Sequence, residues 1–339
     1  MDKKNVAVLF GGCSPEYGVS LESASSVIRN LNLTKYEPIL IGITREGDWY
    51  RYTGPVERIA EDTWYDPACC TPAAVSVSRS CPGILCAGRR IPIDIALPVL
   101  HGKNGEDGTV QGVFALAGIP VAGCGVLASA LCMDKDRAHK LAALAGVRVP
   151  RAQVLRSPKD PVPDIGFPLF VKPVKAGSSF GITKVTEPEQ LAPAIEKAFS
   201  YDDEVIVEEN IPGFEVGCAV LGVDELTVGE VDEIELSQGF FDFTEKYTLK
   251  TSSIHVPARI PREKAEEIRQ TAARLYRALG CSGFARVDMF LTPEGEIVFN
   301  EINTIPGFTE HSRYPTMMKC AGLSFAQVVE RILDEARAE

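Results

Sequence analysis

Polar side chains are spaced along an otherwise apolar segment near the C-terminus, residues 283–307 (GFARVDMFLTPEGEIVFNEINTIPG). Two runs of alternating apolar residues flank residues 293–296, and this spacing predicts a β-hairpin closed by a four-residue loop. Such a loop pairs Leu291 with Val298 and thereby fixes the register of both strands. Residues that lie opposite each other in a hairpin share one face of the ribbon.

Two carboxylates, an amide and a guanidinium meet on one face in this register. Asp288 is expected opposite Glu301, and Arg286 opposite Asn303. Carboxylate and amide oxygens are the hard ligands that suit Mg²⁺ held between a protein and phosphates. A solvated Arg–Asp salt bridge is the alternative, but two directly opposed acids repel each other unless a cation lies between them. The pattern therefore predicts a cation bound near phosphate.

Two lysines could supply positive charge to those phosphates. Lys135 stands at a predicted helix start, and Lys172 ends an apolar strand. The glycine- and serine-rich loop at 176–181 can bring backbone N–H groups and hydroxyls to phosphate oxygens. Solvent-exposed lysines and a plain turn are the alternatives. The motif G-x-x-x-x-G-K-[ST] does not occur, which excludes a Walker-type loop. After the predicted strand 204–207, Glu208 could contact the edge of an adenine.

The elements that must position these residues begin with an open α/β region. Short apolar runs at 6–10, 39–43 and 93–100 predict strands, and the apolar face of residues 20–31 predicts a helix. Strands that alternate with helices indicate a parallel, Rossmann-like sheet with helices on its faces. Residues 50–90 contain the glycine and proline signals of loops.

The rest of the chain predicts two α+β lobes. One helix is expected from Asp134 to Gly146 and another at 262–279, with strands between and after them. A chain of 339 residues is expected to form more than one domain. We predict an N-terminal α/β substrate-binding domain over 1–123, a central lobe over 124–208, and a C-terminal lobe with the metal and substrate site over 209–339.

Composition limits the classes of partner. The formal net charge of −11 argues against a nucleic-acid backbone as a ligand. No apolar run reaches the roughly 18 residues that span a bilayer, and the apolar start of the chain is too short for a secretion signal. A cytoplasmic protein without membrane contact is the expectation. The ten cysteines form no C-x₂-C pair, so free thiols are expected rather than disulfides or zinc ligands.

One segment mimics a nucleotide-binding motif. Residues 123–128 (GCGVLA) fit the relaxed dinucleotide pattern G-x-G-x-x-A, but no acidic residue follows about 20 positions later. We interpret the segment as a turn between domains. Hydride transfer with a dinucleotide is therefore a minor alternative for the function.

Together these motifs resemble the D-alanine–D-alanine ligase family of the ATP-grasp superfamily, over essentially the whole chain. HGKNGEDGTVQG at 101–112 is similar to the N-terminal family signature, and RVDMF…NEINTIPG at 286–307 to the C-terminal one. The other matching motifs follow the family order: GGCSPEYGVSL at 11–21, ALCMDKD at 130–136, VKP…GSSFG at 171–181 and FFDFTEKY at 240–247. Within the family, the chain resembles the G-type vancomycin-resistance enzymes, which are D-alanine–D-serine ligases.

The resemblance implies a reaction in two steps. ATP phosphorylates the carboxylate of a first D-alanine, and the amine of a second amino acid then attacks the acyl phosphate. Glu16 would hold the ammonium group of the first D-alanine, and Arg286 with the Gly307 N–H would form an oxyanion hole. The implied catalytic residues are Glu16, Ser178, Tyr247, Arg286, Gly307 and Ser312. The implied substrate-binding residues are Val19, His101, Ser312 and Arg313.

The resemblance also implies how nucleotide and metal are held. Two Mg²⁺ ions, with Mn²⁺ as a possible substitute, would bind Asp288, Glu301 and Asn303 and screen the charges that approach each other. A homodimer is a further family expectation. The implied ATP-binding residues are Lys135, Lys172, Ser178, Ser179, Glu208, Ile211, Glu215 and Lys246.

Two departures from the family pattern and one further residue bear on the substrate. Arg313 stands where an aliphatic residue is typical of D-alanine–D-alanine ligases, and its guanidinium can engage a hydroxyl-bearing substrate. Tyr247 within Glu-Lys-Tyr argues against a D-lactate ligase. Tyr17 and Gly18 replace a common Arg-Glu pair, a change that could loosen the support around Glu16.

D-Alanine–D-serine ligase is the leading hypothesis, and a D-alanine–D-alanine ligase of cell-wall synthesis is the alternative. The two differ by one hydroxyl group on the second substrate, so the sequence separates them through the surroundings of Arg313. A nucleotide-binding regulator on a degenerate ligase scaffold is a third possibility. The retention of Lys135, Lys172, Arg286 and the hairpin acids argues against it.

Overall fold

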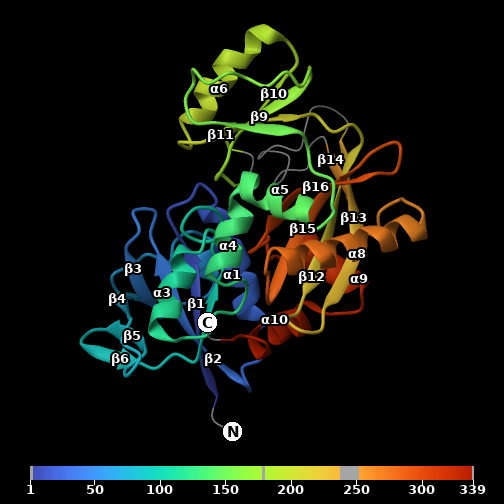
Figure 1. Cartoon of the computed structure of the whole chain (residues 1–339). Helices are drawn as coiled ribbons and strands as arrows, with labels where there is room; N and C mark the ends of the chain where they lie inside the picture. Colours follow the sequence, from blue (N-terminus) through green and yellow to red (C-terminus); the bar gives the residue numbers. More distant parts are fainter. Residues whose placement is uncertain (1–2, 178–179, 237–251, 338–339) are drawn as a thin grey trace.

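Three β-sheets organise the chain into an N-terminal layer, a central lobe and a C-terminal lobe (Figure 1). The computed structural model describes residues 3–177, 180–236 and 252–337. Four residues with predicted roles lie outside that part: Ser178, Ser179, Lys246 and Tyr247. Among the helices it describes, none is both long and apolar enough to cross a membrane.

The N-terminal sheet contains seven strands in the order β6-β5-β4-β3-β2-β1-β7. Its parallel part is the predicted one, and consists of β1 (Lys4–Gly11), β2 (Tyr36–Ile43) and β7 (Ile95–Pro98). Alternate residues of β1 pack toward α1 (Tyr17–Arg29) and toward α3 (Thr109–Ala117), which cover its two faces. Burial on both faces explains why the first strand is a continuous apolar run.

The prediction of loops for residues 50–90 was only partly correct, because Gly54, Pro55, Pro67 and Pro82 lie in loops but regular elements lie between them. This region forms a short helix and four short antiparallel strands: β3 (Trp49–Tyr52), α2 (Glu57–Ala60), β4 (Cys70–Ser76), β5 (Gly83–Cys86) and β6 (Arg89–Ile91). Turn-forming residues lie inside the strands, since Pro72 belongs to β4 and pairs with Tyr50. β4 is half-buried and lacks the regular alternation by which a strand is recognised.

The central lobe contains a four-stranded antiparallel sheet in the order β10-β9-β11-β8. Its strands are β8 (Ala152–Leu155), β9 (Leu169–Pro173), β10 (Thr183–Val185) and β11 (Val205–Glu209). The 3₁₀ turn Pro188–Gln190 leads into α6 (Leu191–Phe199), which packs on this sheet. In Figure 1 this lobe lies at the top of the molecule.

Two consecutive helices precede the central sheet. The predicted helix is α5 (Lys135–Leu144), and its predicted cap is confirmed because the Asp134 carboxylate accepts a hydrogen bond from the Arg137 N–H at 2.9 Å. Residues 123–128 were predicted to form a turn, but only the first part of the segment is non-helical. The helix α4 (Val126–Met133) begins inside it, with Gly125 as its N-cap.

The C-terminal lobe contains a five-stranded antiparallel sheet in the order β14-β13-β12-β15-β16. Its strands are β12 (Phe214–Leu221), β13 (Thr227–Leu236), β14 (Ser252–His255), β15 (Phe284–Leu291) and β16 (Ile297–Asn303). The predicted helix α8 (Arg262–Ala278) packs on one face, and α9 (Arg313–Cys320) on the other.

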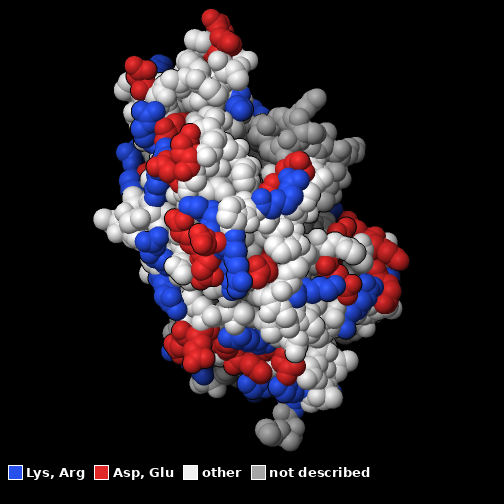
Figure 2. All heavy atoms as spheres, turned by 90° about the vertical axis from the view of Figure 1, so that its right-hand side faces the viewer, with Lys and Arg blue, Asp and Glu red and all other residues white. Residues whose placement is uncertain are grey.

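The two ends of the chain share one hydrophobic core. Residues of α9 and α10 (Phe325–Asp334) cluster with residues of β1 and α1, and Tyr36 donates a hydrogen bond to Asp334. On the face shown in Figure 2, lysine and arginine side chains are interspersed with aspartate and glutamate. All ten cysteines are free thiols, as predicted.

Candidate functional site

The predicted hairpin forms, and its acids lie where the sequence placed them. Asp288 pairs with Glu301 across β15 and β16. The turn end differs by one residue, because Leu291 pairs with Ile297. A β-bulge at Asn300 absorbs the difference, so the register predicted for the acids is correct although the register predicted at the turn is not.

Asp288 is the carboxylate on which the predicted residues converge. Its side chain is buried, and Arg286 donates to its two oxygens from Nε at 2.8 Å and from Nη2 at 2.6 Å. Asn303 Nδ2 donates to Asp288 Oδ2 at 2.8 Å. Arg313 Nη2 lies 3.3 Å from Asp288 Oδ1. Charge-assisted contacts of this kind hold the carboxylate in one orientation.

Arg313 is fixed by an acid that sequence reasoning missed, Asp232. Asp232, Gly217 and Asp288 form one cross-strand row on β13, β12 and β15. Arg313 donates to Asp232 from Nε at 2.6 Å and from Nη2 at 2.8 Å, and to Glu215 from Nη1 at 3.0 Å. A Cβ atom at Gly217 would lie 2.4 Å from Arg313 Nη2, so glycine is needed to leave room for the guanidinium.

Two residues with predicted roles pair with each other beside this row. Arg313, predicted to bind the substrate, forms an ion pair with Glu215, predicted to bind ATP. Asp232 escaped notice because the sequence around it, GEVDEIEL, resembles a strand with ordinary solvated charges. Its complete burial, which decides its importance, is a property of the sheet and of α9 together.

The two lysines of the central lobe are buried. Lys172 on β9 pairs with Glu208 on the neighbouring strand β11, and Lys135 Nζ donates to the Ala176 carbonyl at 2.6 Å. Glu208 Oε2 is buried and has no hydrogen-bond partner among the described residues. A buried carboxylate oxygen without a donor is costly, so this position suits a ligand that brings an N–H group.

The N-terminal residues Glu16 and His101 are held next to each other. A Cβ atom at Gly102 would lie 2.7 Å from Glu16 Oε2, which shows how closely the 101–102 loop approaches this acid. Ser14 Oγ donates to the His101 carbonyl at 2.6 Å and accepts from the Glu16 N–H at 3.2 Å. The ring of His101 contacts the Ile305 carbonyl at 2.8 Å, and burial lowers the pKa of this histidine.

A second buried acid, Glu106, lies beside this pair and was also missed. Its carboxylate accepts from the Gly102 N–H at 2.8 Å and from the Ile305 N–H at 3.1 Å. Burial, together with the nearby charge of Glu16, raises the pKa of Glu106 to about 8. The signature at 101–112 contained the signal, but it does not show which of its polar residues turn inward.

The remaining predicted residues lie in three different segments of the chain. Gly307 and Ser312 are neighbours, since a Cβ atom at Gly307 would lie 3.3 Å from Ser312 Oγ. Val19 is half-buried in α1, and Ile211 is half-buried in the connection between β11 and β12.

Tyr17, one of the two residues that depart from the family pattern next to Glu16, is itself held by two contacts. Trp64 Nε1 donates to the Tyr17 hydroxyl at 2.8 Å, and Arg45 lies 3.8 Å above the tyrosine ring.

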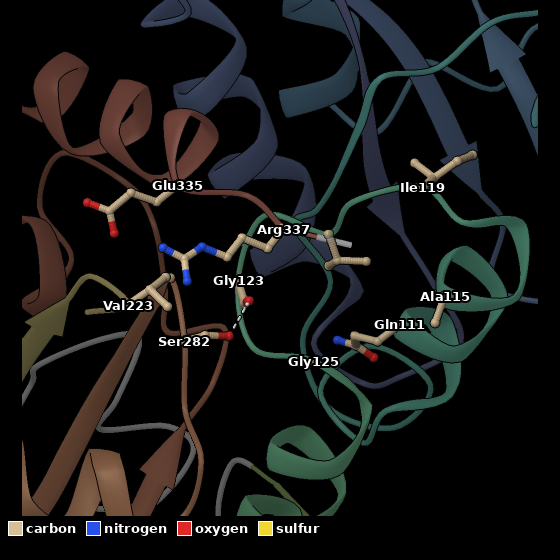
Figure 3. A pocket seen from close by; sticks show the side chains of 11 residues that line it. Gln111, Ala115, Ile119, Gly123, Gly125, Val223, Ser282, Glu335 and Arg337 are labelled. Atoms are coloured by element: carbon tan, nitrogen blue, oxygen red, sulfur yellow. Dashed lines mark hydrogen bonds between the residues drawn. The ribbon is translucent and has the colours of Figure 1, made fainter. Parts of the chain in front are cut away.

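Two cavities lined by described residues differ in whether they include a residue of the predicted site. A cavity of about 260 Å³ is lined by Gly12, His101 and Gly105, among others. A second cavity of about 130 Å³ lies between the N-terminal layer and the C-terminal lobe, with Gln111 and Arg337 on opposite sides (Figure 3). None of the described residues that line this second cavity belongs to the predicted site.

The hairpin residues fit a divalent cation. No group of three or more His, Cys, Asp and Glu side chains in the described part of the chain forms a complete metal cage. Mg²⁺, however, usually binds one or two carboxylates and completes its shell with phosphates and water. Asp288, Glu301 and the amide oxygen of Asn303 provide that donor set on one face. The donor set therefore fits a cation that binds together with a nucleotide.

Two family models match the chain. The model of the D-ala D-ala ligase N-terminus matches residues 5–124, and that of the D-ala D-ala ligase C-terminus matches residues 147–334. The chain belongs to the D-alanine–D-alanine ligase family and is an ATP-dependent ligase with the ATP-grasp fold. The family membership predicted from the sequence motifs is thus confirmed.

Individual relatives cover nearly the whole chain. The crystal structure of VanG D-Ala:D-Ser ligase from Enterococcus faecalis is 60% identical, covers 98% of this chain and 99% of its own, and has a TM-score of 0.93. Vancomycin C-type resistance protein VanC1 of Enterococcus gallinarum is 47% identical over 97% of both chains. A D-alanine–D-alanine ligase of Caldicellulosiruptor bescii is 42% identical over 99% of this chain and 96% of that protein.

Proposed function

We propose that this ligase joins D-alanine to D-serine and so makes the modified dipeptide of a vancomycin-resistant cell wall. The observation that carries the serine assignment is the guanidinium of Arg313, the residue after Ser312, which Asp232 and Glu215 hold in one orientation. A fixed donor group favours a second substrate with a hydroxyl group over one with a methyl group. The similarity to VanG supports the same assignment.

In the proposed mechanism the chain binds and orients three reactants. Glu16 holds the ammonium group of the first D-alanine, and Lys135 and Lys172 neutralise the ATP phosphates. An oxygen of the D-alanine carboxylate attacks the γ-phosphorus atom, and ADP leaves. Bound Mg²⁺ would screen the negative charge of those phosphates.

The second step forms the peptide bond. The amine of D-serine attacks the acyl carbon and loses a proton, and inorganic phosphate leaves. Arg286 and the Gly307 N–H stabilise the oxyanion that develops on the acyl oxygen. Lys246, Tyr247, Ser178 and Ser179 complete the proposal in the roles given above.

Several finer points belong to the same proposal. Two Mg²⁺ ions bind at the hairpin, with Mn²⁺ able to replace them, and Glu208 Oε2 accepts a hydrogen bond from the adenine amino group. The enzyme works as a cytoplasmic homodimer. Its domains divide at residues 123/124 and 208/209.

A competition experiment tests the substrate assignment. The enzyme is incubated with ATP, D-alanine and D-serine at equal concentrations, and the dipeptides are weighed by mass spectrometry. We expect D-Ala-D-Ser as the main product near neutral pH. A predominance of D-Ala-D-Ala would support the alternative, a D-alanine–D-alanine ligase, which the 42% identity to such an enzyme makes the second candidate.

A further inference from the structure

The bulge at Asn300 decides which side chains of β16 face the site. From the turn, Leu291 pairs with Ile297 and Met289 with Phe299. If that register continued, Asn300 would lie opposite Asp288. Because side chains alternate along a strand, Glu301 would then point to the opposite face of the sheet. The extra residue restores the pairing of Asp288 with Glu301.

A bulge leaves backbone groups without partners in the ladder, and here they lie on the edge strand of the sheet. β16 is the last strand of the five-stranded sheet. The carbonyl of Asn300 accepts a hydrogen bond from His139 Nε2 at 2.9 Å. The adjacent Phe299 N–H donates to the Arg148 carbonyl at 2.8 Å. Residues of α5 and of the segment that follows it therefore cover the edge at the bulge.

His139 is well placed to hold the bulge. Its ring is buried and packs edge-on against Phe299, with the ring centroids 5.7 Å apart. It lies one helical turn after Lys135, on the same side of α5. Its Nδ1 atom has no partner in the described part of the chain, so the hydrogen bond to Asn300 is the polar contact that orients the ring.

We propose that His139 is a positioning residue for the metal site. Its hydrogen bond fixes the bulge at Asn300, and the bulge places Glu301 opposite Asp288. The same helix carries Lys135, so the contact also ties a phosphate-binding lysine to the metal-binding hairpin. The inference rests on the proposed function, which assigns the two acids to the metal.

Two substitutions whose side chains are similar in length to each other separate the contribution of the hydrogen bond from that of packing. His139→Met removes the donor, and His139→Gln keeps an N–H near the position of Nε2. We expect His139→Met to weaken Mn²⁺ binding to the enzyme–ADP complex about tenfold, as loss of contacts that orient metal ligands commonly does. His139→Gln should recover most of that affinity. Electron paramagnetic resonance of free Mn²⁺ measures both, and the KM for D-alanine should stay unchanged.

A histidine at the opposite edge of the same sheet provides the control. His255 on β14 contacts Glu235 at 2.8 Å, and His255→Met should leave Mn²⁺ affinity unchanged. If His139→Met does not fold, His139→Leu takes its place.

Two results would overturn the inference: wild-type Mn²⁺ affinity in the variant without a donor, or an equal loss in His139→Gln. Failure of the proposed function is separate, since it would show as absent ADP release by the wild-type enzyme with D-alanine and ATP.

Discussion

Two buried carboxylates, one from the C-terminal hairpin and one from an N-terminal loop, are stabilised in different ways. On the C-terminal hairpin, Asp288 accepts hydrogen bonds from Arg286 and lies close to Arg313, so two guanidinium groups compensate its charge. In the N-terminal loop, Glu106 accepts from two backbone N–H groups and lies near a second acid, Glu16. Burial then raises the pKa of Glu106 to about 8.

The difference shows that the surroundings, and not the residue type, set the charge of a buried acid. The hairpin keeps fixed charges of both signs, which suits a site for metal and phosphate. In the N-terminal loop, Glu106 takes up a proton near neutral pH, and it lies next to Glu16, the residue proposed to bind an ammonium group.

Removing the charge of Asp288 should have the largest effect. Asp288→Asn leaves two buried guanidinium groups without part of their compensation and removes a proposed metal ligand. We expect ADP release with D-alanine to fall by at least about a thousandfold, and the free energy of unfolding by about 3 kcal/mol. Steady-state kinetics and urea unfolding measure the two effects.

A surface pair provides the control for stability. Asp224 and Arg337 form an exposed ion pair at 2.7 Å, and Asp224→Asn should change the unfolding free energy by less than about 1 kcal/mol. Equal losses of stability in Asp224→Asn and Asp288→Asn would show that burial of the hairpin acid has no special energetic role.

Glu301→Gln separates the two roles of the hairpin acids. Glu301 lies opposite Asp288 but is only half-buried. We expect turnover to fall by about two to three orders of magnitude, while the urea midpoint stays close to that of the wild type. Unchanged turnover would show that the hairpin does not bind the metal, and Asp288 would then have a structural role only.

The sequence predicted local geometry better than it predicted burial. The facing of Asp288 and Glu301 followed from strand alternation and hairpin length. This prediction was correct although the predicted register at the turn was wrong, because the bulge at Asn300 shifts the pairing by one residue. Asp232 and Glu106 were missed because both stand among other polar residues, and their burial arises from packing between distant segments. No local pattern carries that information.

The strands between residues 50 and 90 were not predicted for a related reason. They lie at the edge of a sheet, are half-exposed, and contain proline, so neither periodicity nor composition distinguishes them from loops. The family motifs, by contrast, lie in turns and strand ends around the site, where particular residue types are required. Those motifs therefore predicted roles for Glu16, Lys172 and Arg286 that local periodicity alone would not have suggested.

Glu106→Gln should have the smallest effect on turnover and tests the other half of the comparison. The folded-state pKa of about 8 lies above the ordinary pKa of 4.5 for a glutamate, so between these values the folded protein binds more protons than the unfolded chain. Glu106 therefore lowers the unfolding free energy as pH rises through this range, by less than about 1.4 kcal/mol per pH unit, the value for one full proton.

Glutamine resembles the protonated acid, so urea unfolding at pH 5.5, 6.5 and 7.5 should give a flatter profile, with turnover near neutral pH within about threefold of the wild type. Parallel profiles would mean that Glu106 is ionised throughout, and that both buried acids stay charged.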